Sequence, residues 1–437
     1  MARGDRFVAL GYAQARSSWF RDVARWSTSA AIPLEFLKCV TAEEVRARLR
    51  TGRPFSALLV DASAPGVDRD LVDEARSCAC AVIVVDDGRV TRDWSALGAS
   101  AVVPATFDRD DLLSVLDAHT SRIGAPTAHA VVDSCAPSAT PPGALVAVTG
   151  PGGTGASVVA MALAQGLAAG TGDRGRGRGV LLADLALDAD HAMLHDVGDV
   201  VPGVQELVEA HRNGRPSSTD VRALAYAVPA RGYDVLLGLR RHRDWVTIRP
   251  RAFATALDGL RHAYDVVVAE VTGDVEGERQ CGSFDVEERN TMARTTVAEA
   301  DVVLVVGRPG PHGVHALVEL VAALADHGVE GARIVPVVNA APRNPRSRAE
   351  LARAVAELTS FAATATTVFV PERRRLDDLI HAVAPMPSAL VQSVHGAVHT
   401  LLDRRAVATV VGASAGEPSP VPVAPGSLGS WYEDDGT

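Results

Sequence analysis

Lysine is almost absent from this chain. Lys38 is the only lysine in 437 residues, so nearly all of the 43 basic residues are arginines. The formal net charge is −10. A protein that binds DNA regardless of its sequence needs a basic face, because such binding works by neutralising phosphates. The charge balance therefore argues against this class of function, and we expect no sequence-independent DNA binding.

Cysteine is scarce, and long apolar runs are missing. The five cysteines show no paired metal-ligand spacing and their number is odd, which favours a reduced, cytoplasmic setting over a disulfide framework. No stretch approaches the roughly 20 apolar residues that a helix needs to span a bilayer, and no signal peptide is visible. We therefore expect a cytoplasmic protein that reaches a membrane only through a partner.

The chain divides by composition into two candidate domains. Its length and its apolar share of 47% allow two or three domains with ample cores. Residues 122–143 are rich in Pro, Ala and Ser and predict a linker. Residues 409–437 are rich in Pro, Gly and Ser, end in acids, and predict a disordered tail. The candidate domains are residues 1–121 and 144–408.

The first domain alternates strand patterns with helix patterns. The runs ALLVDAS and AVIVVDDG are continuously apolar, as in strands that are buried on both faces of a parallel sheet, and three further runs give five strands in all. Thr41 and Glu44 form a Thr-x-x-Glu capping box that predicts the start of a helix. The pattern predicts a small doubly wound α/β domain.

The order and lengths of these elements resemble a response-regulator receiver domain. Asp61, which ends the third strand, stands where receivers carry the phosphoacceptor aspartate. Phe107 of the receiver's Lys-Pro-Phe element is kept, but Ala105 replaces its lysine. Gly11 and Tyr12 replace the acidic pair that holds Mg²⁺. Because phosphotransfer to Asp61 needs that metal, we expect a receiver-like domain that is not phosphorylated.

The second domain opens with a strand, a glycine-rich turn and a helix. The strand is ALVAVTG, the turn GPGGTGAS follows directly, and VVAMALAQGLAAG predicts the helix. In such a turn the backbone N–H groups converge on phosphate oxygens, and the helix N-terminus adds the positive end of its dipole. Ser157 stands at the position that binds Mg²⁺. The candidate nucleotide-binding residues are Pro151, Gly152, Gly153, Thr154, Gly155, Ala156, Ser157 and Val158.

The pattern Gly-Gly-Thr-Gly-x-Ser resembles the deviant Walker A motif of the MinD/ParA family. That family carries a signature lysine where this chain has Pro151 and a second lysine where it has Ala156. Without these cations, the charge that develops on the phosphates loses its main electrostatic stabiliser. We therefore expect a loop that binds nucleotide with weak or absent hydrolysis. The alternative is a former phosphate loop that has become a plain strand–helix turn.

Other segments resemble further elements of the same family. Asp184 matches the first switch aspartate, while Ala186 replaces the second. Glu270 ends a strand that resembles the Walker B strand, where the family has aspartate. The resemblance implies that Asp184 and Glu270 support the shell around Mg²⁺. It also implies that Asn339 reads adenine and that Pro371 lies near the base, so the expected ligands are ATP or ADP with Mg²⁺.

The resemblance covers about residues 143–405. The pairing of a receiver-like domain with a MinD-type domain is similar to the CpaE/TadZ group, close to its actinobacterial septum-site-determining, CpaE-like branch. This implies a regulator that places division, pilus or secretion machinery at the inner face of the plasma membrane, the cell pole or the septum. The implied partners are that machinery and a second copy of the chain. MinD itself ends in a basic amphipathic membrane helix, which this tail lacks.

Two other functions stay open. One is an active ATPase in which an arginine replaces the lysines; Arg308, Arg343 and Arg373 are candidates because they follow family-like strands near the site. The other is a scaffold that binds no nucleotide. Residues 272–295, which are rich in acids, follow the Walker B position and predict a lid over the site, a partner-docking loop or a plain surface insertion.

Overall fold

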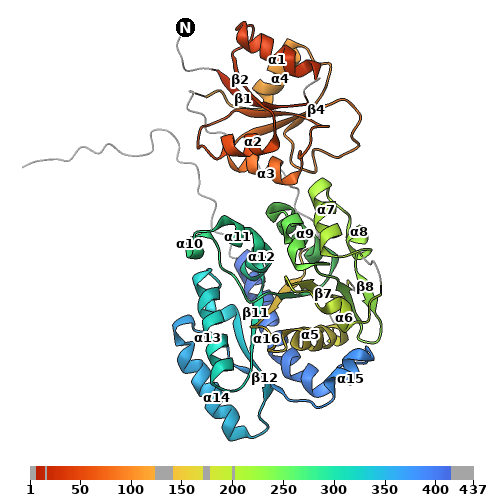
Figure 1. Ribbon diagram of the computed structural model, residues 1–437, viewed down its shortest axis with the longest axis vertical. Helices are drawn as coiled ribbons and strands as arrows, with labels where there is room; N and C mark the ends of the chain where they lie inside the picture. The colour runs from red at the N-terminus through yellow and green to blue at the C-terminus, as the bar shows by residue number, and fades with distance from the viewer. Residues whose placement is uncertain (1–5, 15–16, 124–140, 171–177, 199–201, 415–437) are drawn as a thin grey trace, which may run out of the picture.

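The computed structural model describes residues 6–14, 17–123, 141–170, 178–198 and 202–414, with the backbone alone described from 405 onward. Most of the predicted linker and most of the predicted tail lie outside these ranges. The described residues contain two β-sheets, one in each part of the chain (Figure 1). Both sheets are wholly or mostly parallel, which confirms the predicted α/β fold class.

The N-terminal sheet has five parallel strands in the order β2-β1-β3-β4-β5. Its strands are β1 (Phe7–Tyr12), β2 (Leu34–Cys39), β3 (Ala57–Asp61), β4 (Ala81–Asp86) and β5 (Ala101–Pro104). They lie where the five apolar runs predict them. This strand order belongs to a doubly wound sheet.

Helices cover both faces of the N-terminal sheet, which explains why the inner strands β1, β3 and β4 are largely apolar. The helices are α1 (Ser18–Thr28), α2 (Ala42–Leu49), α3 (Arg69–Ser77) and α4 (Arg109–His119). Helices α1 and α4 pack on one face through side chains such as Trp19 and Leu112. Helices α2 and α3 pack on the other face through Val45 and Leu71.

The predicted cap at Thr41 is confirmed in part. The Thr41 side chain accepts a hydrogen bond from the backbone N–H of Glu44 at 3.1 Å, as in a capping box. The Glu44 carboxylate, however, accepts from the backbone N–H of Val40 rather than from that of Thr41. The cap still occupies two backbone donors at the start of α2.

The second sheet has eight strands in the order β13-β12-β11-β6-β10-β7-β9-β8, and only the β8–β9 pair is antiparallel. The strands are β6 (Ala144–Thr149), β7 (Val180–Leu185), β8 (Tyr226–Val228), β9 (Tyr233–Leu236), β10 (Val266–Val271), β11 (Val302–Gly307), β12 (Ile334–Ala341) and β13 (Val368–Pro371). Strand β6 lies in the middle, and the chain builds first on one side of it and then on the other. The carboxyl end of β6 is therefore a topological switch point, where α/β sheets bind ligands.

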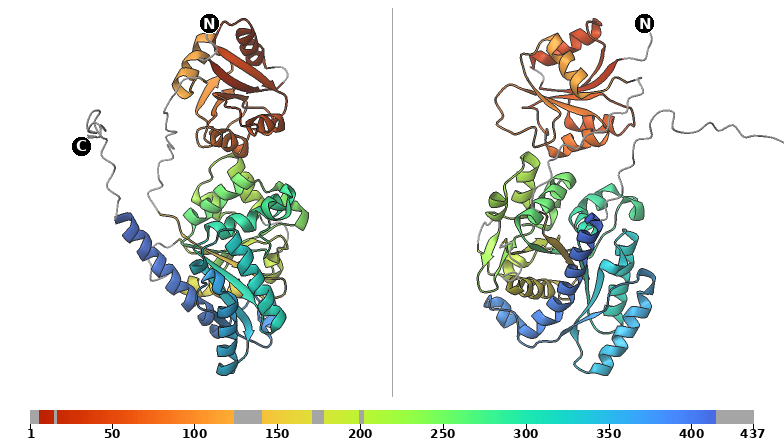
Figure 2. Two further views of the ribbon diagram at one scale, coloured as in Figure 1. Left: turned by 90° about the vertical axis from the view of Figure 1, so that its left-hand side faces the viewer. Right: turned by 180° about the vertical axis from the view of Figure 1, so that it is seen from behind.

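Two sets of long helices sandwich the second sheet. Helices α5 (Ala156–Gly170) and α16 (Ser388–Ser414) share one core cluster, and Figure 2 shows α16 running along the outside of this part of the molecule. The opposite face is covered by α7 (Val204–Asn213), α9 (Pro250–Ala263), α12 (Thr291–Glu299), α13 (Pro311–Asp326) and α14 (Pro345–Leu358). The short helices are α6 (His191–Leu194), α8 (Ser218–Arg222), α10 (Glu278–Cys281), α11 (Phe284–Arg289) and α15 (Leu376–His381).

Helix α16 extends past the predicted boundary at residue 408. It ends at Ser414, so the first six residues of the predicted tail are helical. The segment after Arg405 is rich in alanine and valine, and the sequence contains no helix-breaking proline before Pro418. No helix in the described ranges combines the length and the apolarity that crossing a bilayer requires.

The acidic segment 272–295 is folded and forms two short helices and the start of a third. It comprises α10, α11 and the start of α12, where Met292 and Ala293 are buried against the sheet. Phe284 in α11 is half exposed, and the Arg50 guanidinium of the N-terminal domain lies 5.9 Å from its ring centre. The segment therefore contributes to the core at one end and reaches the N-terminal domain at the other.

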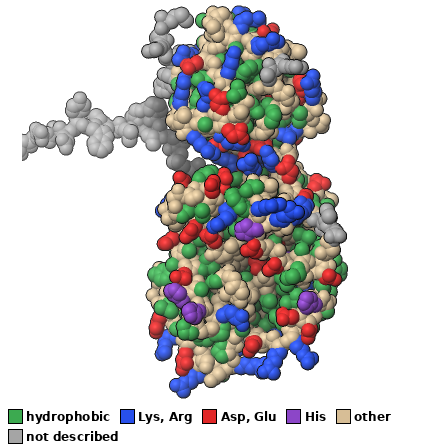
Figure 3. Space-filling view, in the orientation of Figure 1, with side chains coloured by type: hydrophobic (Ala, Val, Ile, Leu, Met, Phe, Trp, Pro, Cys, Tyr) green, Lys and Arg blue, Asp and Glu red, His purple; other side chains and the backbone are tan. Residues whose placement is uncertain are grey.

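Arginine side chains join the two domains. The buried Arg69, at the start of α3, donates to the carbonyl oxygens of His211 at 2.7 Å and Gly214 at 2.9 Å. These carbonyls lie at the C-terminal end of α7, where a helix leaves acceptors unused and favours positive charge. Arg69 is therefore the central anchor of the contact. Figure 3 shows basic and acidic side chains gathered where the two parts meet.

Ion pairs and backbone contacts flank this anchor. Arg212 donates to the Asp68 carboxylate at 2.7 Å, and the backbone N–H of Arg251 donates to Asp70 at 3.1 Å. Asp68 and Asp70 are both buried. Neighbouring residues on both sides of Arg69 therefore contact the second domain as well.

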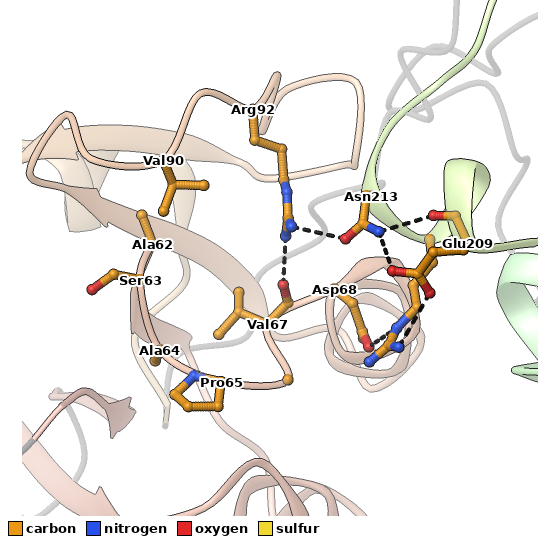
Figure 4. Close-up of a pocket in the computed structure, with 12 residues that line it drawn as sticks. Ala62, Ser63, Ala64, Pro65, Val67, Asp68, Val90, Arg92, Glu209 and Asn213 are labelled. Carbon is orange, nitrogen blue, oxygen red and sulfur yellow. Dashed lines mark hydrogen bonds and ion pairs between the residues drawn. The ribbon is translucent and has the colours of Figure 1, made fainter. Parts of the chain in front are cut away.

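An open cavity of about 290 Å³ lies beside this contact, between the loop that connects β3 to α3 and helix α7 (Figure 4). Arg92 crosses its edge, donating to the carbonyl oxygen of Val67 at 2.7 Å and to the side chain of Asn213 at 2.8 Å. The Arg92–Asn213 bond therefore joins the two domains at the edge of the cavity.

We predict that Arg69→Ala lowers the free energy of unfolding by about 1–3 kcal/mol, because two helix-end carbonyls lose a charged donor in a buried contact. Urea denaturation of the full chain measures the change. The matched control is Arg25→Ala, since Arg25 is exposed and, among the described residues, its side chain pairs with Asp22 on its own helix. We expect the control to change stability by less than about 0.5 kcal/mol. Equal effects of the two variants would contradict the anchoring role of Arg69.

Candidate functional site

The glycine-rich turn lies at the carboxyl end of β6 and leads directly into α5. Gly153 and Gly155 have φ angles of 78° and 87°, in the left-handed region that glycine alone adopts without strain. The Thr154 hydroxyl donates to the carbonyl oxygen of Pro151 at 2.8 Å, and the backbone N–H of Thr154 does so at 3.3 Å. The turn is therefore fixed by its own hydrogen bonds.

The turn exposes a set of unused backbone donors. Within the described part of the chain, no acceptor is found for the backbone N–H groups of Gly152, Gly153, Gly155, Ala156, Ser157 and Val158. They lie at the head of α5, a 15-residue helix whose dipole is positive at this end. Apart from the adjoining residues of the turn, no heavy atom of the described residues lies within 4 Å of where a Cβ would stand at Gly152 or Gly153. The arrangement is suited to binding an anion with several oxygens, such as phosphate.

Asn339 helps to keep one of these donors unused. Its side-chain amide donates to the carbonyl oxygen of Thr154 at 2.8 Å, which is the acceptor that the N–H of Val158 would otherwise use in the helix. The Asn339 oxygen accepts from the backbone N–H of Ala340 at 2.8 Å. Asn339 thus lies against the loop, and its side-chain amide is hydrogen-bonded to the loop backbone.

Pro371 lies at the same edge of the sheet. It pairs with Ala341 across the register shift between β12 and β13, next to Asn339. Both residues therefore belong to the rim at the carboxyl ends of the strands. Their roles at a nucleotide base remain predictions.

Ser157, Glu270 and His191 form a hydrogen-bonded chain beside the loop. The Ser157 hydroxyl donates to Glu270 Oε1 at 2.8 Å, and His191 Nε2 lies 2.7 Å from Glu270 Oε2. Because a carboxylate only accepts, His191 Nε2 is the donor. Both carboxylate oxygens of Glu270 are therefore occupied by protein donors.

Asp184 is enclosed behind this chain. It is 1% exposed, and its two oxygens face the backbone N–H groups of His191 at 3.0 Å and Ala186 at 3.4 Å. Burial raises the pKa of Asp184 to about 6, against the lowering effect of His191. Burial alone would lower the pKa of His191, but the hydrogen bond to Glu270 and the charge of Asp184 raise it.

The strand register explains why these three residues meet. Strand β10 lies between β6 and β7, and Glu270 is paired directly with Asp184. His191 begins α6, just after β7, at the same edge of the sheet. Sequence reasoning identified Asp184 and Glu270 but missed His191. The available signal was its position seven residues after Asp184, near the carboxyl end of a predicted strand.

Ser157 keeps oxygen lone pairs for a metal, but each oxygen of Glu270 and Asp184 already accepts from a protein N–H or O–H group, which leaves one lone pair per oxygen for metal-bound waters. Because Asp184 is also almost fully buried, the arrangement fits a hydrated Mg²⁺ ion poorly. Among the described residues, no cluster of three or more His, Cys, Asp or Glu side chains is arranged to hold a metal ion.

One of the three candidate arginines contacts the loop. The Arg308 Nη1 atom lies 3.5 Å from the carbonyl oxygen of Gly153, at the limit of a hydrogen bond. In the described part of the chain, Arg343 and Arg373 have no hydrogen bond or ion pair with the loop. Lys38, the single lysine, lies in β2 of the other domain.

The receiver-like position Asp61 is buried and satisfied by protein donors. The Ser63 backbone N–H and hydroxyl donate to Oδ1 at 3.0 and 2.7 Å, and the Ser17 hydroxyl donates to Oδ2. Burial raises the pKa of Asp61, but these hydrogen bonds outweigh it and the net pKa is lowered. Tyr12, at the position of a receiver acid, donates its hydroxyl to the Pro65 carbonyl at 2.7 Å. The absence of phosphorylation remains a prediction.

Comparison with known proteins finds no matching family model and no similar curated protein. A ParA family ATPase from Chlorobium tepidum TLS is 15% identical, with 59% of this chain and 99% of that chain covered and a TM-score of 0.46. A putative plasmid partition protein from Borrelia burgdorferi B31, bound to AMPPNP, is 14% identical over 60% and 100% of the chains, with a TM-score of 0.44.

The septum site-determining protein MinD from Pyrococcus horikoshii OT3, complexed with Mg-ADP, is 17% identical. The match covers 63% of this chain and 99% of that chain, with a TM-score of 0.43. At these identities, and with TM-scores below 0.5, the similarities do not establish a family for this chain.

We predict that Asp61→Ala destabilises the chain by about 1–3 kcal/mol at neutral pH, because the Ser17 and Ser63 donors lose a buried acceptor. The folded pKa of Asp61 lies below its unfolded value, so its contribution is present above about pH 4 and is lost as the pH falls through the folded pKa. Urea denaturation at neutral and acidic pH measures both effects. The exposed control Asp22→Ala should change stability by less than about 0.5 kcal/mol. If Asp61→Ala left the free energy of unfolding unchanged, the hydrogen bonds from Ser17 and Ser63 to Asp61 would not stabilise the fold as predicted.

Proposed function

We propose that this chain binds ATP or ADP through the loop from Gly152 to Val158, with weak or absent hydrolysis. We further propose that the chain positions other cellular machinery and that bound nucleotide switches this activity. The observation that carries the proposal is the set of unused backbone N–H groups at the head of α5. Gly152 and Gly153 are exposed and the residues from Gly155 to Val158 are partly exposed, so a ligand can reach these donors, and phosphate oxygens satisfy several of them at once.

The location of the loop supports a nucleotide over a simple anion. The loop follows the central strand β6 at the switch point of the sheet, and the rim beside it carries Asn339 and Pro371. Asn339 contacts the loop directly, so a base held near it would lie next to bound phosphates. We propose that this rim receives the base.

The charges around the loop support binding without efficient hydrolysis. Neither Pro151 nor Ala156 supplies the cation that phosphoryl transfer requires, and the hydrogen bonds of the loop come from neutral backbone groups. Backbone donors hold the ground state, but they add little to the charge that develops in the transition state. The proximity of Arg308 to Gly153 favours a second candidate, an ATPase that uses this arginine.

The wider role rests on the sequence resemblance to MinD/ParA proteins and to the CpaE/TadZ group. We propose a cytoplasmic regulator, recruited to the membrane, pole or septum by a partner in the division, pilus or secretion machinery. A second copy of the chain is a further proposed partner. The named structural neighbours include a septum site-determining protein and a plasmid partition protein, which is the same general kind of role.

An equilibrium titration with a fluorescent ATP analogue, followed by a phosphate-release assay, tests the proposal. We expect saturable binding at or below millimolar nucleotide and no phosphate release above background. Binding with sustained phosphate release, abolished by Arg308→Ala, would favour the ATPase. No binding at millimolar nucleotide would contradict both the nucleotide-binding regulator and the ATPase, and would favour a scaffold that binds no nucleotide.

A variant pair tests whether the loop binds the phosphates. We predict that Ala156→Lys tightens binding about tenfold, because a cation is added beside the backbone donors. Gly153→Val should weaken binding to a similar extent, since its φ of 78° is strained for a β-branched residue. The same titration measures both. If neither change alters the affinity of folded protein, the phosphates bind elsewhere.

A further inference from the structure

We propose that nucleotide binding at this loop does not depend on Mg²⁺, because His191 takes the hydrogen-bonding position on Glu270 that a metal-bound water would use. The inference rests on the proposed nucleotide-binding function and concerns what that site requires. The juxtaposition of Ser157, Glu270 and His191 carries it.

The first observation is that each carboxylate oxygen of Glu270 already accepts a hydrogen bond from the protein. Its Oε1 accepts from Ser157 at 2.8 Å and its Oε2 accepts from His191 at 2.7 Å. The Glu270 side chain is only 12% exposed. A carboxylate that supports a hydrated Mg²⁺ ion accepts from its waters, and each oxygen that already accepts one protein hydrogen bond has a single lone pair left for this. Here both oxygens face protein donors.

The second observation is the enclosure of Asp184. Its oxygens face backbone N–H groups, and a Cβ placed on Gly238 would lie 2.9 Å from its carboxyl carbon. The segment after β9 therefore closes over Asp184 at near contact. This carboxylate has no room to serve a hydrated metal.

The third observation is that His191 is held in place by the core. Its side chain is 1% exposed, and its backbone carbonyl accepts from His195 Nδ1 at 2.8 Å. The other nitrogen of His195 accepts from the Tyr233 hydroxyl at 2.9 Å, deep between the sheet and its helices. The turn that carries His191 is thus fixed by residues away from the loop, and its imidazole is enclosed by the core with Glu270 as its hydrogen-bond partner.

With Glu270 and Asp184 engaged by the protein, the groups that would bind the nucleotide phosphates are the backbone N–H donors and the dipole of α5. Such donors bind phosphate oxygens whether or not a metal shields them, and free nucleotide carries more negative charge than its Mg²⁺ complex. The backbone donors of the loop can therefore bind nucleotide without a metal, while Ser157, Glu270 and His191 are hydrogen-bonded to one another.

The test is a titration of the full chain with a fluorescent ATP analogue, once in millimolar Mg²⁺ and once in excess EDTA. We expect the two dissociation constants of the wild type to agree within about fivefold. A larger tightening by Mg²⁺ would overturn the inference and leave the proposed function standing. Absence of binding in both buffers would overturn the proposed function, and the inference with it.

Two substitutions test the part played by His191. His191→Gln keeps an N–H donor for Glu270, and we expect its binding to stay independent of Mg²⁺. His191→Leu removes the donor at similar volume, and we expect Mg²⁺ to tighten its binding by more than about tenfold. The exposed control His315→Ala should match the wild type. Circular dichroism establishes that each variant is folded, and the wild-type titration decides the inference if His191→Leu does not fold.

Mg²⁺-independent binding by folded His191→Leu would show that His191 does not exclude the metal and would overturn its assigned role. If binding by His191→Gln depended on Mg²⁺, the hydrogen bond to Glu270 would not be what makes wild-type binding independent of the metal.

Discussion

The backbone N–H groups at the head of α5 are not used by the fold itself, and several neighbouring contacts keep them free. Gly153 and Gly155 hold the turn in a left-handed path, and the hydrogen bonds from Thr154 to Pro151 fix it. Asn339 takes the carbonyl that would otherwise pair with Val158. A rigid set of donors at a helix N-terminus loses little entropy when it binds phosphate, which is why pre-organised turns of this kind bind anions.

The strand order of the second sheet determines which side chains lie beside these donors. Because β10 lies between β6 and β7, Glu270 stands beside both the loop and Asp184. His191 follows β7 and reaches Glu270 from the same edge. Both carboxylates therefore accept hydrogen bonds from protein donors, and the loop has Pro151 and Ala156 where lysines were expected. Under the proposed function, these features together describe a site for binding rather than for turnover.

Local sequence patterns predicted the elements but not the contacts between distant ones. The strands β1 to β6, the cap at Thr41 and the turn before α5 follow from apolar runs and turn residues within a few positions of each other. The bond between His191 and Glu270 joins residues 79 apart, and the bond between Arg69 and His211 joins residues 142 apart. Such contacts depend on strand order and domain docking, which no local pattern specifies. Helix α16 continues to Ser414, into the segment predicted as tail, because the composition of a segment does not specify where its preceding helix ends.

The central claim is that the amides at the head of α5 bind the phosphates of a nucleotide. Amide NMR of the deuterated, nitrogen-15-labelled full chain tests it directly, with ADP added in EDTA. The account predicts that the amide protons of Gly152, Gly153, Gly155, Ala156, Ser157 and Val158 shift to higher frequency on saturation, as they do when donating to charged oxygen. Saturable shifts confined to other parts of the chain, or no shifts at millimolar ADP, would contradict it.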